Sequence, residues 1–497
     1  MKKNTKAIAL LMSAVCTIGL LAGCGNKQSA NSTPVSSEPT SKVSEAAAPS
    51  KAEETKEEAA PVDVTTISWW SGDSHNKELM EQLVNDFNNT VGKEKGIAID
   101  YKVIGGDSAA QATELALQSG VGPDLFTKGS MKTMAEEGII LALEDLPGGD
   151  ELLARYEGKI PSGFISGGKT YRVPITATTR ALIYNKDMFV EAGLVDENGE
   201  ATPPKTYDEL REYAQILTDE SSRKYGIIWP MKWGGWYSSD IADAVFQAKV
   251  SSFNYETGTY DYSGMKPVLE CFAGMYADGS VYPGADSVDN DSARALFAEG
   301  VIGMKFAYSF DVGVLNDQFP AKCDWGVAPL PVLDENERYT QVMTYSGSPY
   351  INARSAAEPE KLLEVYKFIT SDEVAIAKYE QGYDVPWNWD IVADAELSAD
   401  APKGFKEFCQ MASISELKPS GLKADITGEN NEIVELTPFL TGNRSIDELD
   451  ETLEVLTDRL NAGIDRYYEA NPDSKEADSA VIGWKQSKAD ASSFYGK

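Results

Sequence analysis

The most explicit chemical pattern in this sequence is a match to a phosphate-binding loop. Residues 163–170 read Gly-Phe-Ile-Ser-Gly-Gly-Lys-Thr, which fits G-x-x-x-x-G-K-T. Such a loop binds phosphate only when a buried strand precedes it and a helix follows it. Here the preceding segment, 155–161, is charged and ends in proline, and the following segment, 171–174, is extended and also ends in proline. We therefore predict a hairpin turn at 167–169 and no nucleotide site.

Catalytic side chains are scarce in other respects. His75 is the single histidine, which excludes multi-histidine metal sites and weakens imidazole catalysis. No G-x-S-x-G nucleophile motif is present. The 78 Asp and Glu residues are too numerous for one pair to be chosen as a glycosidase acid and base. The sequence therefore predicts no catalytic residue, no metal site and no cofactor.

Aromatic residues in polar, glycine-rich stretches favour a binding surface for sugars. A sugar has apolar C–H faces and a polar rim, so its site needs flat aromatic rings beside carboxylates and amides. Any single one of these rings could instead belong to the core. The relevant residues are Trp69, Trp70, Trp229, Trp233, Trp236, Tyr237, Tyr308, Phe310, Tyr345, Tyr383, Trp387 and Trp389.

The elements that must position these residues follow from periodicity. Strands are predicted at 66–70, 97–103 and 123–126, with helices at 78–88 and 109–118 between them. This β-α-β-α-β order is typical of a parallel sheet with helices on its faces. Later helices are predicted at 207–218, 266–278, 292–299, 358–370 and 445–461.

The N-terminal residues carry a targeting signal. Three lysines precede an apolar run at 7–21, which is too short to span a membrane and has the length of a signal h-region. The run ends in Leu21-Ala22-Gly23-Cys24, which resembles the lipobox of bacterial lipoproteins. That resemblance implies a signal peptide at 1–23, lipidation of Cys24 and anchoring on the extracellular face of the cell membrane. Residues 24–65 are rich in Ser, Ala, Pro, Glu and Lys and predict a flexible tether.

Charge and cysteine content restrict the partners. The 497 residues carry a net charge of −33, which disfavours nucleic acid and suggests a soluble monomer. Apart from Cys16 in the signal and Cys24, three cysteines remain. Cys271, Cys323 and Cys409 leave one disulfide open as an alternative, but buried small hydrophobic residues are the preferred interpretation.

Several short motifs follow one another along the chain. They are 122–126 (GPDLF), 169–174 (KTYRVP), 181–189 (ALIYNKDMF), 192–194 (AGL), 204–210 (PKTYDEL), 297–304 (FAEGVIGM), 328–331 (APLP) and 366–371 (YKFITS). The segment 204–210 also predicts a helix with a capping box at Thr206 and Glu209. In this order the motifs resemble the extracellular solute-binding proteins of ABC importers, of the maltodextrin-binding type.

The resemblance implies an α/β, two-lobed clamshell like that of periplasmic binding proteins, occupying residues 66–497. Lobe 1 would comprise about 66–178 and 353–412, and lobe 2 about 179–352 and 413–497. Hinge strands would cross at 177–181 and 349–352. A ligand in the cleft would stabilise the closed state, because both lobes then contact it, and the transporter permease would recognise that state.

Position within the family suggests individual ligand-binding residues. These are Trp70, Ser71, Asp73, Thr178, Arg180, Trp233, Trp236, Tyr308, Phe310, Asp311, Tyr345, Ser346 and Trp387. The family commonly has a tryptophan where Phe310 stands here, so the resemblance does not select a particular sugar.

The leading hypothesis is thus a lipid-anchored protein that captures a sugar or oligosaccharide and delivers it to ABC transporter permease subunits. Three alternatives stay open at this point. The same fold could bind a polyamine or organic acid, the protein could be an anchored glycoside hydrolase, or the clamshell could serve adhesion or sensing.

Overall fold

The computed structural model describes residues 64–495 apart from 74, 105–108, 420, 421, 423, 425, 427, 429, 430 and 480. The predicted signal peptide 1–23, Cys24 and the linker up to residue 63 lie outside the described residues. Within the part of the chain that is described, no helix combines the length and the apolar character that a membrane crossing requires.

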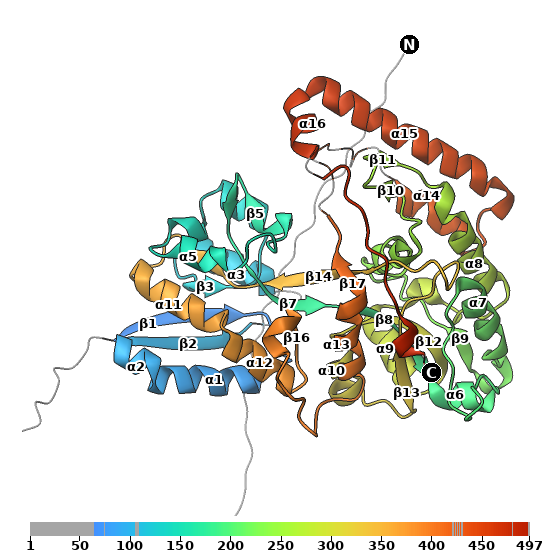
Figure 1. Cartoon of the computed structure of the whole chain (residues 1–497), viewed down its shortest axis with the longest axis horizontal. Helices are drawn as coiled ribbons and strands as arrows, with labels where there is room; N and C mark the ends of the chain where they lie inside the picture. Colours follow the sequence, from blue (N-terminus) through green and yellow to red (C-terminus); the bar gives the residue numbers. More distant parts are fainter. Residues whose placement is uncertain are drawn as a thin grey trace, which may run out of the picture. The chain divides into compact units, whose positions relative to one another are not determined.

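Five strands form the first sheet, in the order β2-β1-β3-β15-β4. Figure 1 labels β1, β2 and β3 of this sheet. They are β1 (Thr65–Ser71), β2 (Ile97–Val103), β3 (Leu125–Phe126), β4 (Ile140–Leu141) and β15 (Tyr350–Asn352). β1 is parallel to β2 and β3, whereas β15 is antiparallel to β3 and β4. The predicted β-α-β-α-β order is confirmed, with α1 (Lys77–Asn89) and α3 (Ala109–Gln118) among the parallel strands.

The apolar side of α1 covers one face of this sheet. Ile67 and Trp69 alternate along β1 and are buried, and they share a core cluster with Met80, Val84 and Phe87 of α1. The helical spacing of the last three places them on one side of α1. Burial of each such side chain contributes about 1.5–3 kcal/mol. This packing fixes the carboxyl end of β1, from which the loop at residue 71 continues.

Four strands form the second sheet, in the order β13-β8-β12-β9. They are β8 (Arg180–Asn185), β9 (Tyr225–Ile227), β12 (Ile302–Tyr308) and β13 (Trp325–Ala328). All six residues of β8 are buried, because helices cover both of its faces. One face packs on α7 (Tyr207–Ile216) and α8 (Lys266–Ala277), and the other on α9 (Asn290–Ala298) and α13 (Phe405–Met411).

The predicted capping box begins α7. The Thr206 hydroxyl accepts a hydrogen bond from the Glu209 N–H, and the Glu209 carboxylate accepts one from the Thr206 N–H. These bonds satisfy backbone donors that the first turn of a helix leaves free. Here the local sequence alone sets the start of the helix.

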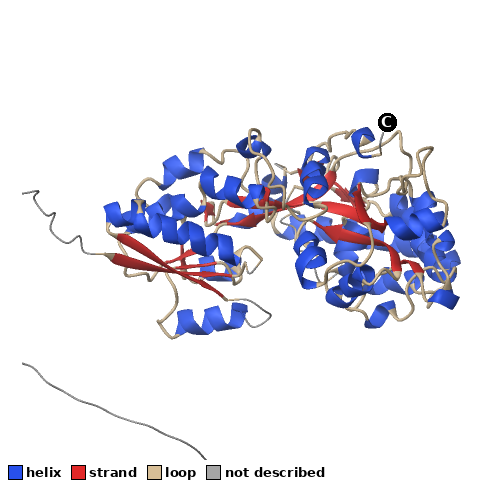
Figure 2. Ribbon diagram, turned by 90° about the horizontal axis from the view of Figure 1, so that it is seen from below, coloured by secondary structure: helices blue, strands red, loops and turns tan. Residues whose placement is uncertain are grey.

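A third sheet, in the order β16-β7-β14-β17, connects the other two. Its strands are β7 (Pro174–Thr178), β14 (Gln341–Gly347), β16 (Val385–Pro386) and β17 (Ser415–Leu417). β7 leads into β8 of the second sheet, and β14 leads into β15 of the first. Figure 2 shows red strands running between two groups of blue helices. The chain therefore forms two α/β lobes joined by hinge strands, as predicted.

Two lobe boundaries differ from the prediction. Residues 350–352 are not a hinge crossing but β15 of the first sheet, and the crossing lies earlier, in β14. Helix α13, assigned to lobe 1, packs instead on the second sheet, because Phe405 and Phe408 are buried in one cluster with Ile183 of β8. The apolar side chains of α13 thus decide which lobe the helix joins, and its position along the chain does not.

The segment that matched a phosphate loop is a hairpin, as predicted. β5 (Ile165–Ser166) and β6 (Lys169–Thr170) are antiparallel, and the turn glycines Gly167 and Gly168 have φ of 57° and 77°. Only glycine adopts such angles readily, so both positions need it. The Lys169 ammonium forms an ion pair with Asp145 at 2.6 Å. Lys169 therefore has a structural partner in a turn that lacks the helix a phosphate site requires.

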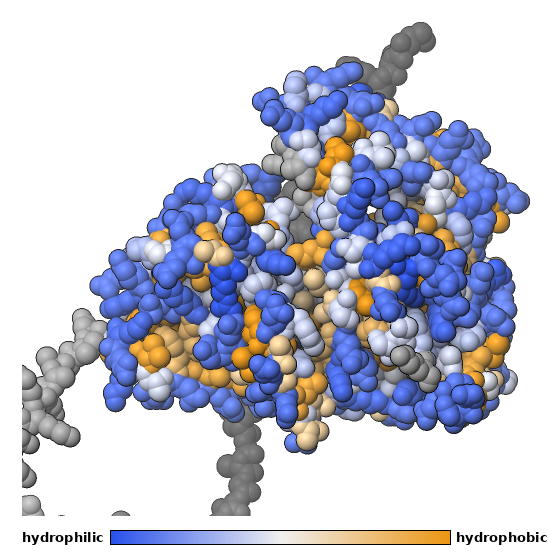
Figure 3. All heavy atoms as spheres, viewed as in Figure 1, coloured by the Kyte–Doolittle hydropathy of each residue, from blue (hydrophilic) through white to orange (hydrophobic). Residues whose placement is uncertain are grey.

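The remaining elements lie around the three sheets. Cys271, Cys323 and Cys409 are free thiols. Cys271 and Cys409 are buried, as predicted, whereas Cys323 is half-buried. The face seen in Figure 3 is predominantly hydrophilic, in keeping with the net charge of −33. The other elements are α2 (Val91–Lys95), α4 (Met131–Glu136), α5 (Gly149–Ala154), α6 (Lys186–Glu191), α10 (Asp311–Gly313), α11 (Pro359–Ile369), α12 (Asp372–Glu380), α14 (Glu432–Leu440), α15 (Leu449–Ala470), α16 (Pro472–Asp478), β10 (Phe253–Asn254) and β11 (Thr259–Tyr260).

Candidate functional site

The strand register locates a candidate binding site at the hinge. β1 and β3 are parallel, and the end of β3 pairs with Tyr350, which follows β14 of the connecting sheet. In the other lobe β9 and β12 are parallel, and the end of β12, at Tyr308, pairs with Arg180, which follows β7. The carboxyl ends of parallel strands in both lobes therefore adjoin the connecting strands. Ligands of α/β proteins bind beside such strand ends.

The first-lobe side of the hinge is built from the loops after β1 and β3. The Gly72 N–H donates to Thr127 Oγ1 at 2.7 Å. A Cβ at position 72 would lie 2.1 Å from Cε of Lys128, so only glycine allows this approach. Ser71 is buried, and its hydroxyl accepts from the Asp73 N–H at 3.1 Å. Of the predicted residues here, Ser71 has a structural role, whereas Trp70 and Asp73 are half-buried.

The carboxylate of Asp384 holds the loop after β1. Asp384 Oδ1 lies 2.9 Å from His75 Nε2, and Asp384 Oδ2 lies 3.1 Å from Lys378 Nζ and accepts from Asn76 Nδ2 at 3.0 Å. Burial opposes ionisation of Asp384, but Lys378 and His75 hold its pKa well below the usual range. Burial lowers the pKa of His75, but the hydrogen bond and charge of Asp384 outweigh burial and raise that pKa. The single histidine is thus a structural partner of Asp384.

Two buried polar side chains secure the strand crossings. The Thr179 hydroxyl donates to the Phe408 carbonyl at 2.7 Å, and the Thr179 carbonyl accepts from the Ser309 N–H at 3.0 Å. Gln341 Nε2 donates to the Arg180 carbonyl at 2.9 Å, and Gln341 Oε1 accepts from the Leu330 N–H at 2.7 Å. Both side chains are fully buried. They fix the start of β8 relative to β14.

Three aromatic rings form a platform at the carboxyl ends of β9 and β12. The Tyr308 and Phe310 rings stack at 4.9 Å between centroids, with 12° between their planes. Trp233 meets Tyr308 edge-on at 6.4 Å. Phe310 is 46% exposed, whereas Tyr308 and Trp233 are half-buried. Phe310 therefore offers an exposed ring that its neighbours hold in place. We call Phe310, Tyr308 and Trp233 the aromatic platform.

Arg180 lies beside this platform, but its charge is already paired. Its guanidinium lies 4.7 Å from the Tyr308 ring centroid, forms an ion pair with Asp243 at 2.7 Å and donates to the Ser239 carbonyl at 2.9 Å. Asp243 also pairs with Lys418 at 2.8 Å. An acidic ligand would have to compete with Asp243 for this buried guanidinium, so these contacts favour an uncharged ligand.

Asp311 belongs to a buried charge cluster behind the platform. Asp311 Oδ1 accepts from Arg294 Nε at 2.7 Å, and Oδ2 accepts from the Tyr308 N–H at 3.1 Å. Lys305 Nζ lies 3.8 Å from Oδ2. The Asp311 side chain is 1% exposed. This predicted ligand residue therefore neutralises buried cations and positions Tyr308, and it is closed to ligand in this structure.

Asp240 is a further buried carboxylate near Lys305 and Arg180. It lies in a π-helix at Tyr237–Ala242, and its Oδ2 has no hydrogen-bond partner among the described residues. Burial raises the pKa of Asp240 to about 6, although the charges of Lys305 and Arg180 oppose this shift and Asp311 supports it. The carboxyl therefore binds a proton more readily in the folded than in the unfolded chain.

Asp240→Asn is expected to remove a pH dependence of stability. Because the pKa of Asp240 is raised in the folded state, its contribution to the free energy of unfolding is fully present below its unfolded pKa. This contribution is lost as pH rises through about 6. The loss is about 3 kcal/mol at most. Urea unfolding should show that the free energy of unfolding of the variant rises relative to that of the wild type as pH increases. The difference between the two should be constant above pH 6. Asp291→Asn, at an exposed partner of Arg294, is the control. A difference between Asp240→Asn and wild type that does not vary with pH would contradict this assignment.

The structure thus brings most of the predicted residues to the hinge. Trp70, Ser71 and Asp73 lie on the first-lobe side, and Thr178, Arg180, Trp233, Tyr308, Phe310, Tyr345 and Ser346 lie on the second-lobe side or on the connecting strands. Ser346 is exposed, and Thr178 and Tyr345 are half-buried.

Two predicted tryptophans are core residues in the structure. Trp236 is 3% exposed and packs on Trp229 at 6.2 Å. Trp387 is 7% exposed and packs on Tyr156 at 4.8 Å. Their polar sequence neighbours suggested a loop surface, but each ring points into a lobe.

Sequence reasoning missed Thr127, Lys128, Asp243 and Asp384. Thr127 and Lys128 had a usable signal, because they directly follow the predicted strand 123–126 and strand ends carry sites. Asp243 and Asp384 had none, since their partners are distant in sequence. Among the residues that the structure describes, no three His, Cys, Asp or Glu side chains are grouped as a metal site requires.

The chain has two α/β lobes, and the strand ends of both lobes adjoin the strands that connect them. This is the architecture of a two-lobed binding protein. Residues 72–376 match the family of bacterial extracellular solute-binding proteins, and the chain belongs to this family. The matched range includes the loops after β1, β3, β9 and β12, so it covers the hinge site described above.

Relatives and a solved structure agree with this family. A putative binding protein of Brucella abortus (strain 2308) is 27% identical over 278 residues, 54% of this chain and 64% of its own. The maltotriose-binding protein of Pyrococcus abyssi is 26% identical over 315 residues, 62% of this chain and 64% of its own. A solute-binding protein of an ABC transporter from Thermotoga lettingae, bound to α-D-tagatose, has a TM-score of 0.57 and 21% identity, covering 80% of this chain and 99% of its own. The chain therefore matches less than two thirds of the length of these two curated relatives, while it covers the whole fold of the structure.

Proposed function

We propose that this protein captures a sugar or oligosaccharide at the hinge and delivers it to the permease subunits of an ABC transporter. It would do so on the extracellular face of the cell membrane, anchored by lipid on Cys24. The family membership supports solute binding outside the cell. Two of the similar proteins are named for or bound to sugars, maltotriose and tagatose, which supports a carbohydrate ligand.

The single observation that carries the sugar assignment is the aromatic platform. Phe310 is open, stacks on Tyr308 and lies where strand ends of the second lobe meet the connecting strands. An aromatic ring of this kind stacks on the C–H face of a pyranose. Asp73 and Ser346 lie on the first lobe and the connecting strands and offer acceptors for hydroxyl groups. Because ligand contacts come from both lobes, binding would favour the closed state.

A thermal-shift screen of residues 60–497 tests the proposal and finds the ligand. The panel holds mono- and oligosaccharides, polyamines, amino acids and organic acids. A ligand at about 100 times its Kd stabilises the folded state by roughly 2.7 kcal/mol, which shifts Tm visibly. We expect stabilisation by one sugar class, with the sugar recovered unchanged. Stabilisation only by amines or acids would contradict the sugar assignment, and consumption of the sugar would indicate a hydrolase.

Phe310→Ala is expected to weaken binding of the stabilising sugar about tenfold, because the open face of the platform is lost. Calorimetric titration measures the effect. Tyr276→Ala is the matched control, since Tyr276 is a 41% exposed ring at the end of α8 and should leave Kd unchanged. An unchanged Kd in Phe310→Ala would place the sugar elsewhere.

Cys24→Ala is expected to release the protein from the membrane fraction, because stable anchoring depends on acyl chains at this residue. Fractionation followed by immunoblotting detects the change. Cys16→Ala alters a cysteine inside the apolar run and should stay in the membrane fraction. The lipobox assignment would be contradicted if the Cys24→Ala protein stayed in the membrane fraction and mass spectrometry found no lipid on the wild-type protein.

A further inference from the structure

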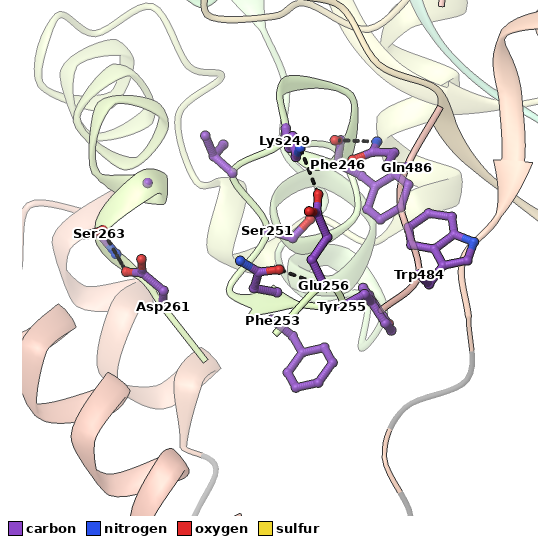
Figure 4. A pocket seen from close by; sticks show the side chains of 13 residues that line it. Phe246, Lys249, Ser251, Phe253, Tyr255, Glu256, Asp261, Ser263, Trp484 and Gln486 are labelled. Carbon is purple, nitrogen blue, oxygen red and sulfur yellow. Dashed lines mark hydrogen bonds and ion pairs between the residues drawn. The ribbon is translucent and has the colours of Figure 1, made fainter. Parts of the chain in front are cut away.

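A pocket outside the set of hinge residues lies in the second lobe. It has a volume of about 170 Å³ and is lined by residues of 246–264 and by Trp484 and Gln486 of the C-terminal segment (Figure 4). None of its lining residues belongs to the hinge site described above. We call it the Trp484 pocket.

Aromatic rings form one wall of this pocket. The Trp484 indole stacks on Phe246 with centroids 6.0 Å apart and 26° between planes, and it meets Tyr255 edge-on at 5.7 Å. Phe246 and Tyr255 are buried, whereas Trp484 is half-buried. The indole is therefore supported from the protein side while part of it lines the pocket.

The C-terminal segment is held firmly against the lobe. Gln486 Nε2 donates to the carbonyls of Phe246 and Thr340, both at 2.8 Å. The next residue, Ser487, donates its N–H to Glu416 at 3.0 Å. Thr340 and Glu416 adjoin or belong to strands β14 and β17 of the connecting sheet. The wall is thus preformed, and a ligand would not have to order it.

Charged and polar groups of both signs surround the rings. Lys249 and Glu256 form an ion pair at 3.0 Å and remain 46% and 37% exposed. Asp261 is exposed and accepts from the Ser263 hydroxyl at 2.6 Å. Figure 4 draws it across the pocket from Trp484. Lys249 also has a left-handed backbone with φ of 58°, which is uncommon for a residue other than glycine and clusters at functional positions. The pocket therefore offers a flat ring, an ammonium donor and two carboxylate acceptors.

We propose that the Trp484 pocket is a second carbohydrate site that takes one pyranose unit. The indole contacts the C–H face of the ring, and Lys249, Glu256 and Asp261 bind its hydroxyl groups. The unit belongs either to a separate sugar or to the distal end of an oligosaccharide held at the hinge. The site itself is built from residues outside the hinge site, so only its occupation by the distal end of an oligosaccharide rests on the proposed function of the hinge.

Fluorine NMR of 5-fluorotryptophan-labelled protein tests this proposal. Trp484→Phe assigns the Trp484 resonance by its loss, and Trp233→Phe assigns a hinge resonance in the same way. Titration with methyl glucoside, methyl galactoside, maltotriose and cellotriose to millimolar concentration is expected to shift the Trp484 resonance saturably. Trp389, which is 43% exposed and outside the pocket, is the control resonance, assigned by Trp389→Phe.

The outcomes separate the two sites. A Trp484 shift that persists in Phe310→Ala identifies a separate sugar, and a shift that weakens together with the Trp233 response identifies the distal unit of a bound oligosaccharide. Glu256→Gln is expected to weaken the Trp484 response roughly tenfold while leaving Trp233 unchanged. A Trp233 response without a Trp484 response overturns the second site alone. A Trp484 response without one at Trp233 supports the second site and counts against the hinge. Silence at both overturns the second site.

Discussion

Asp311→Ala is expected to reduce the free energy of unfolding by about 3–5 kcal/mol, because removal of one partner leaves buried charges without compensation. Asp311 is 1% exposed and accepts from Arg294, while Lys305 lies 3.8 Å away. It also accepts from the Tyr308 N–H, so the platform should loosen as well. Urea unfolding monitored by circular dichroism measures the loss.

The matched control for Asp311 is Asp291, which also pairs with Arg294, at 2.7 Å, but is 65% exposed. Exposed ion pairs contribute about 0–1 kcal/mol, so Asp291→Ala should unfold close to the wild type. Equal losses in the two variants would contradict the assignment of Asp311 to a buried cluster. A stable Asp311→Ala protein with greatly weakened sugar binding would restore Asp311 as a ligand residue.

Trp387→Ala is expected to cost about 3–5 kcal/mol of stability, the range for truncating a buried Trp. Its ring is 7% exposed and packs on Tyr156 in the core of the first lobe. Thermal and urea unfolding should both show the loss. If enough protein folds at low temperature, its sugar affinity should stay within about twofold of the wild type, since no ligand contact is removed.

Trp389 provides the comparison for Trp387. It lies two residues along the chain, is 43% exposed and contacts Tyr379 edge-on at 5.8 Å. Trp389→Ala should lose about 1 kcal/mol or less, as surface substitutions do. A Trp387→Ala protein as stable as Trp389→Ala, but unable to bind sugar, would show that the sequence-based assignment of Trp387 was right.

Local signals in the sequence predicted much of the fold. Alternation defined β1, helical spacing defined α1, and the Thr206 and Glu209 pair defined the start of α7. The hairpin at Gly167 and Gly168 followed from turn chemistry and from the absence of a helix after Lys169. In each case residues close in sequence contact one another, so the pattern holds the information.

The parts that could not be predicted depend on contacts between distant segments. Trp236 and Trp387 have the polar neighbours of a loop, yet their rings pack on Trp229 and Tyr156. Helix α13 was assigned by position to lobe 1, but Phe405 packs on the second sheet. Polar neighbours predict that a backbone segment lies at the surface. They do not predict whether one aromatic side chain in that segment points outward or into the core.

The same limit applies to the electrostatics of the site. Arg180 was among the predicted ligand-binding residues, and an organic acid stayed open as a ligand, because the sequence does not show which charges lie beside Arg180. The structure pairs it with Asp243, which Lys418 also contacts. A basic residue in a predicted cleft can therefore be fully compensated, and its availability to a ligand is decided by the fold.

We propose that a sugar ring binds at the hinge against Phe310. A crystal structure of residues 60–497 with the sugar found in the screen tests this most directly. We expect ligand density in contact with the Phe310 ring, with hydroxyl groups facing the loops after β1 and β3. Density for the sugar elsewhere, with Phe310 still open to solvent, would contradict it.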